Sequence, residues 1–141
     1  MANLLEDIEI YFLSLTSSHE ICTNLNATFS SNGNLFLVME PSSPTDCVTI
    51  IPYGGAPLDT RHKEAQYPSI QIRVRTTTVN KGYKVTQAII NDLHQNVSLG
   101  SNISMQCFAI QSQPVLLKFD EEDYPVYVAN FNIMHTKYSV S

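Results

Sequence analysis

The segment Tyr67–Arg75 constrains the fold of this chain more than any other stretch, because its apolar and polar residues alternate. In an extended chain, successive side chains point to opposite faces. Three aliphatic residues therefore point one way and three polar residues the other way: Ile70, Ile72 and Val74 against Gln71, Arg73 and Arg75. This period of two predicts a strand with one face in a hydrophobic core and a cationic face in water.

An amphipathic helix is predicted after this strand, from Lys81 to Asn96. Its apolar residues recur every three or four positions: Val85, Ile89, Ile90, Leu93 and Val97. A second amphipathic helix is predicted over Asn3–Leu15. One stripe of that helix is apolar: Leu4, Leu5, Ile8, Phe12 and Leu15. Strands backed by amphipathic helices are typical of small α+β domains.

Further strands are predicted from short β-branched or alternating segments. These are Leu35–Met39, Cys47–Tyr53, Met105–Gln111, Val115–Phe119 and Val126–His135. The last two are expected to pair as an antiparallel hairpin, with the acidic run Asp120–Asp123 at its tip. The segment Thr16–Asn34 is rich in Ser, Asn and Thr, and is predicted to be mostly loop.

Together these elements predict an α+β fold with a mixed, mainly antiparallel β-sheet of about four to five strands packed with two α-helices. No linker divides the sequence, so residues 1–141 are expected to form a single domain. The apolar faces that must pack together predict a shared core of Ile70, Ile72, Ile89, Leu93, Phe131 and Ile133.

Charge is distributed unevenly along the chain. The net charge is −5, which gives no support to nucleic-acid binding, because phosphate contacts need a surplus of Lys and Arg. Six of the eight basic residues lie between Arg61 and Lys84, whereas four acids are adjacent at Asp120–Asp123. The chain therefore carries one basic and one acidic region along its sequence.

The sequence contains no catalytic constellation. The four histidines stand in separate contexts, and HExxH, GxGxxG and GK[ST] are absent. The three cysteines, Cys22, Cys47 and Cys107, form no CxxC pair and are expected to be buried in a reduced, intracellular protein. Acids occupy the start of the chain, where a signal peptide carries Lys or Arg, and no apolar run reaches membrane-spanning length. We therefore predict no enzymatic activity, metal site or cofactor.

Several short motifs occur in a characteristic order. An N-terminal helix precedes the Y-G-G-A-P turn at Tyr53–Pro57 and the P-S-I-Q-I-R-V-R strand at Pro68–Arg75. A helix containing Tyr83 follows, and the final hairpin carries N-F-N-I at Asn130–Ile133. In order and size, the chain from Leu4 to Tyr138 resembles the phage minor capsid and tail terminator family, small proteins of the tail-terminator fold.

The resemblance implies a structural protein of the virion tail and neck. Members cap the tail tube, stop its polymerisation and join it to the head connector, commonly as a hexameric ring. The implied partners are other copies of the chain, the tail tube protein and the head connector or neck proteins, with assembly in the host cytoplasm. No small-molecule substrate, membrane or sequence-specific nucleic acid is implied. The alternative is a head-completion or connector adaptor, or another non-catalytic protein-binding module.

A ring with head-to-tail contacts needs two different, complementary patches on each chain. We predict a cationic patch and an acidic patch with an aromatic anchor: Arg61, Lys63, Arg73 and Arg75, against Asp120, Glu121, Glu122, Asp123 and Tyr124. The acidic tip is expected to reach Arg61 and Lys63 of an adjacent subunit, or a partner ring. The alternative for each patch is a solvated surface that binds nothing.

Overall fold

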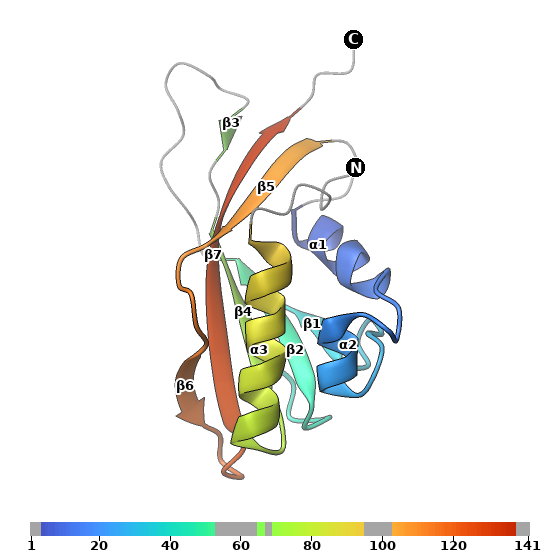
Figure 1. Ribbon diagram of the computed structural model, residues 1–141, viewed down its shortest axis with the longest axis vertical. Helices are drawn as coiled ribbons and strands as arrows, with labels where there is room; N and C mark the ends of the chain where they lie inside the picture. The colour runs from blue at the N-terminus through green and yellow to red at the C-terminus, as the bar shows by residue number, and fades with distance from the viewer. Residues whose placement is uncertain (1–3, 53–64, 67–68, 95–102, 138–141) are drawn as a thin grey trace.

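The computed structural model describes residues 4–52, 65–66, 69–94 and 103–137, which form one β-sheet with α-helices on one of its faces (Figure 1). Along the chain the elements follow the order α1, α2, β1, β2, β3, β4, α3, β5, β6, β7. The predicted α+β class is confirmed. In the described part of the chain the sheet has seven strands, including the two-residue β3, where the sequence predicts about four to five.

The sheet is organised around its last strand, β7 (Pro125–Lys137). One edge of β7 pairs with β4 (Ser69–Arg75) and β3 (Ala65–Gln66), and the other pairs with β6 (Val115–Phe119) and β5 (Ile103–Ala109). All four pairings are antiparallel, and the predicted hairpin of the last two strands is confirmed.

Two further strands extend the sheet beyond β4. These are β2 (Cys47–Pro52), which is antiparallel to β4, and β1 (Leu35–Leu37), which is parallel to β2. The path β1-β2-β4-β7 places β1 at one end of the sheet, and β6 lies beyond β7 at the other end (Figure 1).

The helices cover one side of the sheet, here called the helix face. The side chains that the strands contribute to this face form a continuous buried layer: Val48, Ile50, Ile70, Ile72, Val74, Ala129, Phe131 and Ile133. All six predicted core residues belong to the same buried cluster, which confirms the packing inferred from the alternation. The side chains between them point to the opposite side, here called the second face.

Three helices pack on the helix face: α1 (Leu4–Leu13), α2 (Glu20–Leu25) and α3 (Val79–Leu93). The two predicted amphipathic helices are α1 and α3, and α3 begins where the Thr78 hydroxyl accepts a hydrogen bond from the backbone N–H of Lys81 (3.2 Å). The prediction of loop over Thr16–Asn34 is wrong at α2. This helix of six residues packs against α3 and buries three apolar side chains: Ile21, Cys22 and Leu25.

Helix α3 lies unusually close to β7 near its first turn. A Cβ on Gly82 would lie 2.8 Å from Oγ1 of Thr76 and 2.9 Å from Cδ2 of Tyr127, so only glycine fits there without a shift. Tyr127 thereby packs against the helix, and its ring contacts that of Tyr83 edge-on with centroids 6.0 Å apart. The start of α3 and the N-terminal end of β7 are therefore fixed relative to each other.

Candidate interaction surfaces

The tip of the β6–β7 hairpin is held by its first acid. The Oδ1 atom of Asp120 accepts hydrogen bonds from the backbone N–H groups of Glu122 (2.9 Å) and Tyr124 (2.8 Å). Backbone bonds between Asp120 and Tyr124 and between Asp123 and Asp120 close the turn. Asp123 has φ 64°, a left-handed conformation that Asp tolerates better than most residues. The turn thus exposes three carboxylates: Glu121, Glu122 and Asp123.

Arg75 departs from the sequence prediction. Its side chain lies on the second face, as the alternation indicates, but it is 4% exposed and does not point into water. Its guanidinium donates to the carbonyl oxygens of Pro44 (2.8 Å) and Thr45 (3.2 Å), and its Nε lies 3.8 Å from Oδ2 of Asp120. A buried cation is tolerated only with partners of this kind. Arg75 therefore joins the hairpin tip to the segment before β2.

The segment between β1 and β2 explains this burial. Because β1 and β2 are parallel, their connection must run back from one end of the sheet to the other. Residues 38–46 make that return, and their carbonyls reach Arg75 on the second face. The segment is anchored at Asp46, which accepts hydrogen bonds from the backbone N–H of Thr77 (3.0 Å) and from Nζ of Lys81 (2.5 Å).

Arg73 is half-buried on the same face and belongs to a chain of polar side chains. Its Nε donates to Oε1 of Gln71 (2.8 Å), and Nε2 of Gln71 donates to Oδ1 of Asn130 (3.1 Å). Gln111 continues the chain, because its Oε1 accepts from Nδ2 of Asn130 (3.3 Å). The prediction that Gln71 faces water is wrong, since these neighbours leave it 8% exposed. Arg73 remains the accessible cation of this strand.

The other predicted cations, Arg61 and Lys63, lie outside the described residues, so the expected contact of the acidic tip with them stays a prediction. Tyr124 is half-buried at the base of the tip. Of the nine predicted interface residues, the structure therefore brings Arg75 and Asp120 together within one chain.

Strand β6 is an apolar surface that the sequence analysis did not single out. All five of its residues are exposed, and four of them are large and apolar: Val115, Leu116, Leu117 and Phe119. Among the described strands it pairs with β7 alone, so its outer edge carries unpaired backbone groups. In the sequence, this strand is an apolar run between Pro114 and the acidic run. Such a run is compatible with a strand at the end of a sheet as well as with a core strand.

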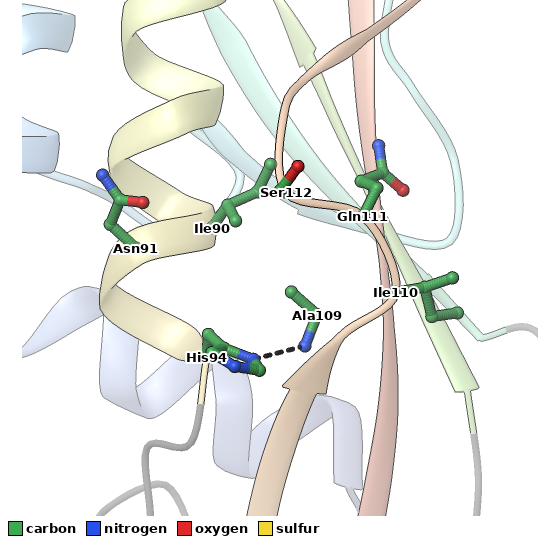
Figure 2. Close-up of a pocket in the computed structure, with 7 residues that line it drawn as sticks. All are labelled: Ile90, Asn91, His94, Ala109, Ile110, Gln111 and Ser112. Carbon is green, nitrogen blue, oxygen red and sulfur yellow. Dashed lines mark hydrogen bonds between the residues drawn. The ribbon is translucent and has the colours of Figure 1, made fainter.

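A shallow pocket of about 480 Å³ lies between the end of α3 and the segment after β5, lined by Ile90, Asn91, His94, Ala109, Ile110, Gln111 and Ser112 (Figure 2). The imidazole in this pocket has a structural role. Nδ1 of His94 accepts a hydrogen bond from the backbone N–H of Ala109 (3.0 Å; Figure 2). The lining amides and hydroxyl offer binding groups but no nucleophile paired with a base. The pocket therefore gives no basis for a catalytic assignment.

The three cysteines are buried and free, as predicted. Burial raises the pKa of the Cys47 thiol to about 11, an effect that Arg75 opposes and Glu40 reinforces. Burial raises the pKa of Cys107 to about 12. These thiols are poor nucleophiles, because the reactive form is the thiolate.

The described residues also bear on metal binding and on membrane insertion. They contain no group of three or more His, Cys, Asp or Glu side chains placed to hold a metal ion. Within the same part of the chain, none of the helices has the length and apolar character that a membrane span requires.

Comparison with known families adds one finding. A family model described as bacteriophage tail terminator protein matches residues 5–137, which include nearly every described element. A comparison with curated proteins gave no match.

Proposed function

The chain belongs to the bacteriophage tail terminator family, and from this membership we propose that it caps the tail tube and stops its polymerisation. We further propose that it joins the tube to the head connector, as a hexameric ring. The observation that carries the proposal is the family match, because it spans residues 5–137 and so involves the whole fold rather than one motif.

Members of this family are structural proteins of the virion tail. The proposed action is accordingly binding without catalysis, with no small-molecule substrate or cofactor. The partners are other copies of the chain, the tail tube protein and the neck proteins. Assembly takes place in the host cytoplasm, and the finished protein stays in the virion.

Two surfaces support binding of this kind. The hairpin tip presents Glu121, Glu122 and Asp123 on a turn whose backbone Asp120 holds by hydrogen bonds, so little backbone entropy is lost when the turn binds a partner. Large exposed apolar groups next to such a tip, as on β6, are typical of interaction sites. We propose Arg73 and the three exposed acids as contact residues, and Arg75 and Asp120 as residues that position the tip.

The proposal is tested in a phage that lacks the gene for this protein. Electron microscopy of the lysate is expected to show tail tubes of uncontrolled length and heads without tails. Adding the purified protein should restore joined, infectious particles. Tails of normal length attached to heads in the absence of the protein would overturn the proposal. Tails of normal length that fail to attach would instead favour a connector adaptor.

A further inference from the structure

The start of α3 and strand β6 border the same part of the helix face. Leu116 on β6 lies directly opposite Tyr127 on β7, so their side chains are neighbours. The ring of Tyr127 also contacts that of Tyr83 on α3, edge-on, with centroids 6.0 Å apart. Tyr127 is buried, whereas Leu116 and Tyr83 are exposed. One buried ring thus joins two exposed apolar side chains, one from β6 and one from α3.

Two more exposed apolar residues extend this surface. Val79 lies one turn before Tyr83 on the same side of α3. Phe119 lies opposite Pro125, two positions before Tyr127 on β7. Figure 1 shows the start of α3 and β6 at the same end of the molecule as the β6–β7 turn. We call this surface the α3–β6 patch and define it by its exposed residues: Val79, Tyr83, Leu116 and Phe119.

A bulge in β6 keeps the α3–β6 patch free of a cation. The register shifts between Leu116 and Lys118, so the strand contains one extra residue there. In a regular strand Lys118 would share the helix face with Leu116, because side chains two positions apart point the same way. The bulge instead places Lys118 opposite Val126 on the second face and brings Phe119 to the helix face. The second face of β6 carries Val115 and Lys118.

The side of α3 that bears the patch follows the β5–β6 edge along the whole helix. Gln87, one turn after Tyr83, donates from Nε2 to the carbonyl oxygen of Ser112 (3.2 Å). At the other end of the helix, His94 bonds to Ala109 beside the pocket of Figure 2. At about 1.5 Å per residue, this side of α3 is about 20 Å long. The length suits a segment of a protein better than a small molecule.

The α3–β6 patch ends at an acidic turn. Phe119 is followed by the hairpin tip, where Glu121, Glu122 and Asp123 are exposed. In the described part of the chain, none of these acids takes part in an ion pair. Such carboxylates repel the phosphates of nucleic acids and of anionic lipids. The net charge of −5 also disfavours a second copy at this acidic end. The complementary partner is a protein segment with cations beside its apolar side chains.

We propose that the α3–β6 patch binds a segment of another virion protein that carries large apolar side chains and, at the end beside the hairpin tip, Lys or Arg. The apolar side chains cover the patch, and the cations pair with the exposed acids. Burial of the patch supplies affinity, and the charges fix the direction in which the segment lies. The inference rests on the proposed function, because that function makes the partner a tail tube or neck protein.

A synthetic peptide tests the chemistry of the surface without the natural partner. The probe is an amphipathic peptide of Leu, Lys and Ser, and its control carries Glu in place of every Lys. In NMR titrations of the protein, the Lys peptide should shift the backbone resonances of Tyr83 and Leu116. It should also bind at least about tenfold more tightly than the Glu peptide. Equal binding of the two peptides, or shifts confined to other parts of the protein, overturns the proposal.

Two neighbouring residues of β6 provide a variant and its matched control. Leu116→Ser removes an apolar side chain from the patch, whereas Val115→Ser makes a similar change on the second face. The two side chains are comparably exposed, at 41% and 48%, so both variants should stay folded by circular dichroism. Leu116→Ser should lower the affinity for the Lys peptide about tenfold, and Val115→Ser should leave it unchanged. Equal effects of the two variants overturn the proposal.

The tail-joining assay in the lysate separates this inference from the proposed function. Wild-type protein should restore joined particles, and Leu116→Ser should restore fewer of them than Val115→Ser. If both variants restore joining as well as the wild type, the patch is not the contact and the proposed function stands. If the wild type restores nothing, the proposed function is overturned, and the peptide titrations still decide whether the patch binds a cationic segment.

Light scattering distinguishes the proposed occupant from a second copy. If the wild type forms oligomers that Leu116→Ser dissociates and Val115→Ser does not, the patch is covered by another copy of the chain and the proposal is wrong. Oligomers that are indifferent to both variants leave the patch free for the proposed segment and support it.

Discussion

The hydroxyl of Tyr11 donates a 2.6 Å hydrogen bond to Oδ2 of Asp92, a residue 81 positions further along the chain. The other oxygen of Asp92 lies 3.1 Å from Nε2 of His19. Because Nδ1 of His19 accepts a hydrogen bond from the backbone N–H of Ile21 (3.2 Å), Nε2 carries the ring hydrogen and donates a hydrogen bond to Asp92. One carboxylate thus joins α1, the start of α2 and α3.

We expect Asp92→Asn to lower the free energy of unfolding by about 1.5–3 kcal/mol, because the amide has no negative charge and only one of its two polar atoms can accept a hydrogen bond. Tyr11→Phe should cost less, since the Tyr11 ring stays packed. In a double-mutant cycle followed by urea denaturation, the two changes should be strongly non-additive. Strictly additive losses would mean that the pair contributes no coupling.

The two arginines of β4 should differ sharply. Arg75→Met leaves two buried carbonyls and Asp120 without their partner, so we expect a loss of about 3 kcal/mol in unfolding free energy. Arg73→Met, the matched control, removes one bond to a neighbour on its own strand and should cost less than about 1 kcal/mol. Urea denaturation measures both. Equal effects would contradict the roles that their burial assigns.

The hydrophobic core gives a prediction that follows from the sequence and the structure alike. Ile72→Ala and Leu93→Ala should each lower stability by about 2–5 kcal/mol, because both side chains are fully buried and leave a cavity. Leu117→Ala on exposed β6 is the control and should stay within about 0.5 kcal/mol. Thermal and urea unfolding report the difference, and unchanged curves for both core variants would refute the packing.

The exposed acids of the hairpin tip should affect binding, whereas Asp120 should affect stability. Replacing Glu121, Glu122 and Asp123 with Ser should leave the melting temperature nearly unchanged, because exposed charges are screened. The same variant should join tails less efficiently in the lysate assay, and added salt should weaken the wild type similarly.

Asp120→Ala provides the contrast, because it removes two turn hydrogen bonds and the partner of Arg75. We expect it to lower the melting temperature. Tail joining that is indifferent to both the triple variant and salt would leave the tip as a solvated turn.

Because of the buried thiols, we expect the free energy of unfolding to fall at alkaline pH. Burial raises the pKa of Cys47 to about 11 and that of Cys107 to about 12 in the folded protein, from an ordinary value of 9.0. The unfolded chain therefore releases these protons first, and the stabilisation present below pH 9.0 is lost as pH rises toward the folded values. Each thiol should contribute about 1.4 kcal/mol per pH unit in that interval.

Urea unfolding between pH 8 and pH 11 measures this loss. Cys107→Ala removes one titrating thiol with little change of shape, so its stability should fall less steeply than that of the wild type. Parallel curves would show that Cys107 does not titrate differently in the two states.

Periodicity predicted the faces of the long elements correctly. The alternation of Ile70, Ile72 and Val74 placed them in the core, and the stripe on α1 placed Ile8 and Phe12 there too. Such a pattern lies within a single helix or strand. When that element packs on a large core, the apolar face that the pattern defines is the face that becomes buried.

The sequence failed where burial depends on a distant segment. Alternation gives the direction in which Arg75 points, but the carbonyls of Pro44 and Thr45 that bury it come from a connection far away in the chain. Helix α2 escaped prediction because so short a helix depends on packing, here against α3, rather than on propensity. The exposure of β6 likewise follows from its place at the end of the sheet.

The position of β7 in the sheet has a consequence for synthesis of the protein. The ribosome releases β3, β4, β5 and β6 before β7, and each of them pairs with β7. Until residues 125–137 emerge, a nascent chain therefore carries strands with open edges and an apolar layer that lacks its centre. Chains growing side by side on one messenger RNA cannot dock in their final form, so subunit assembly has to wait for the emergence of a single late segment.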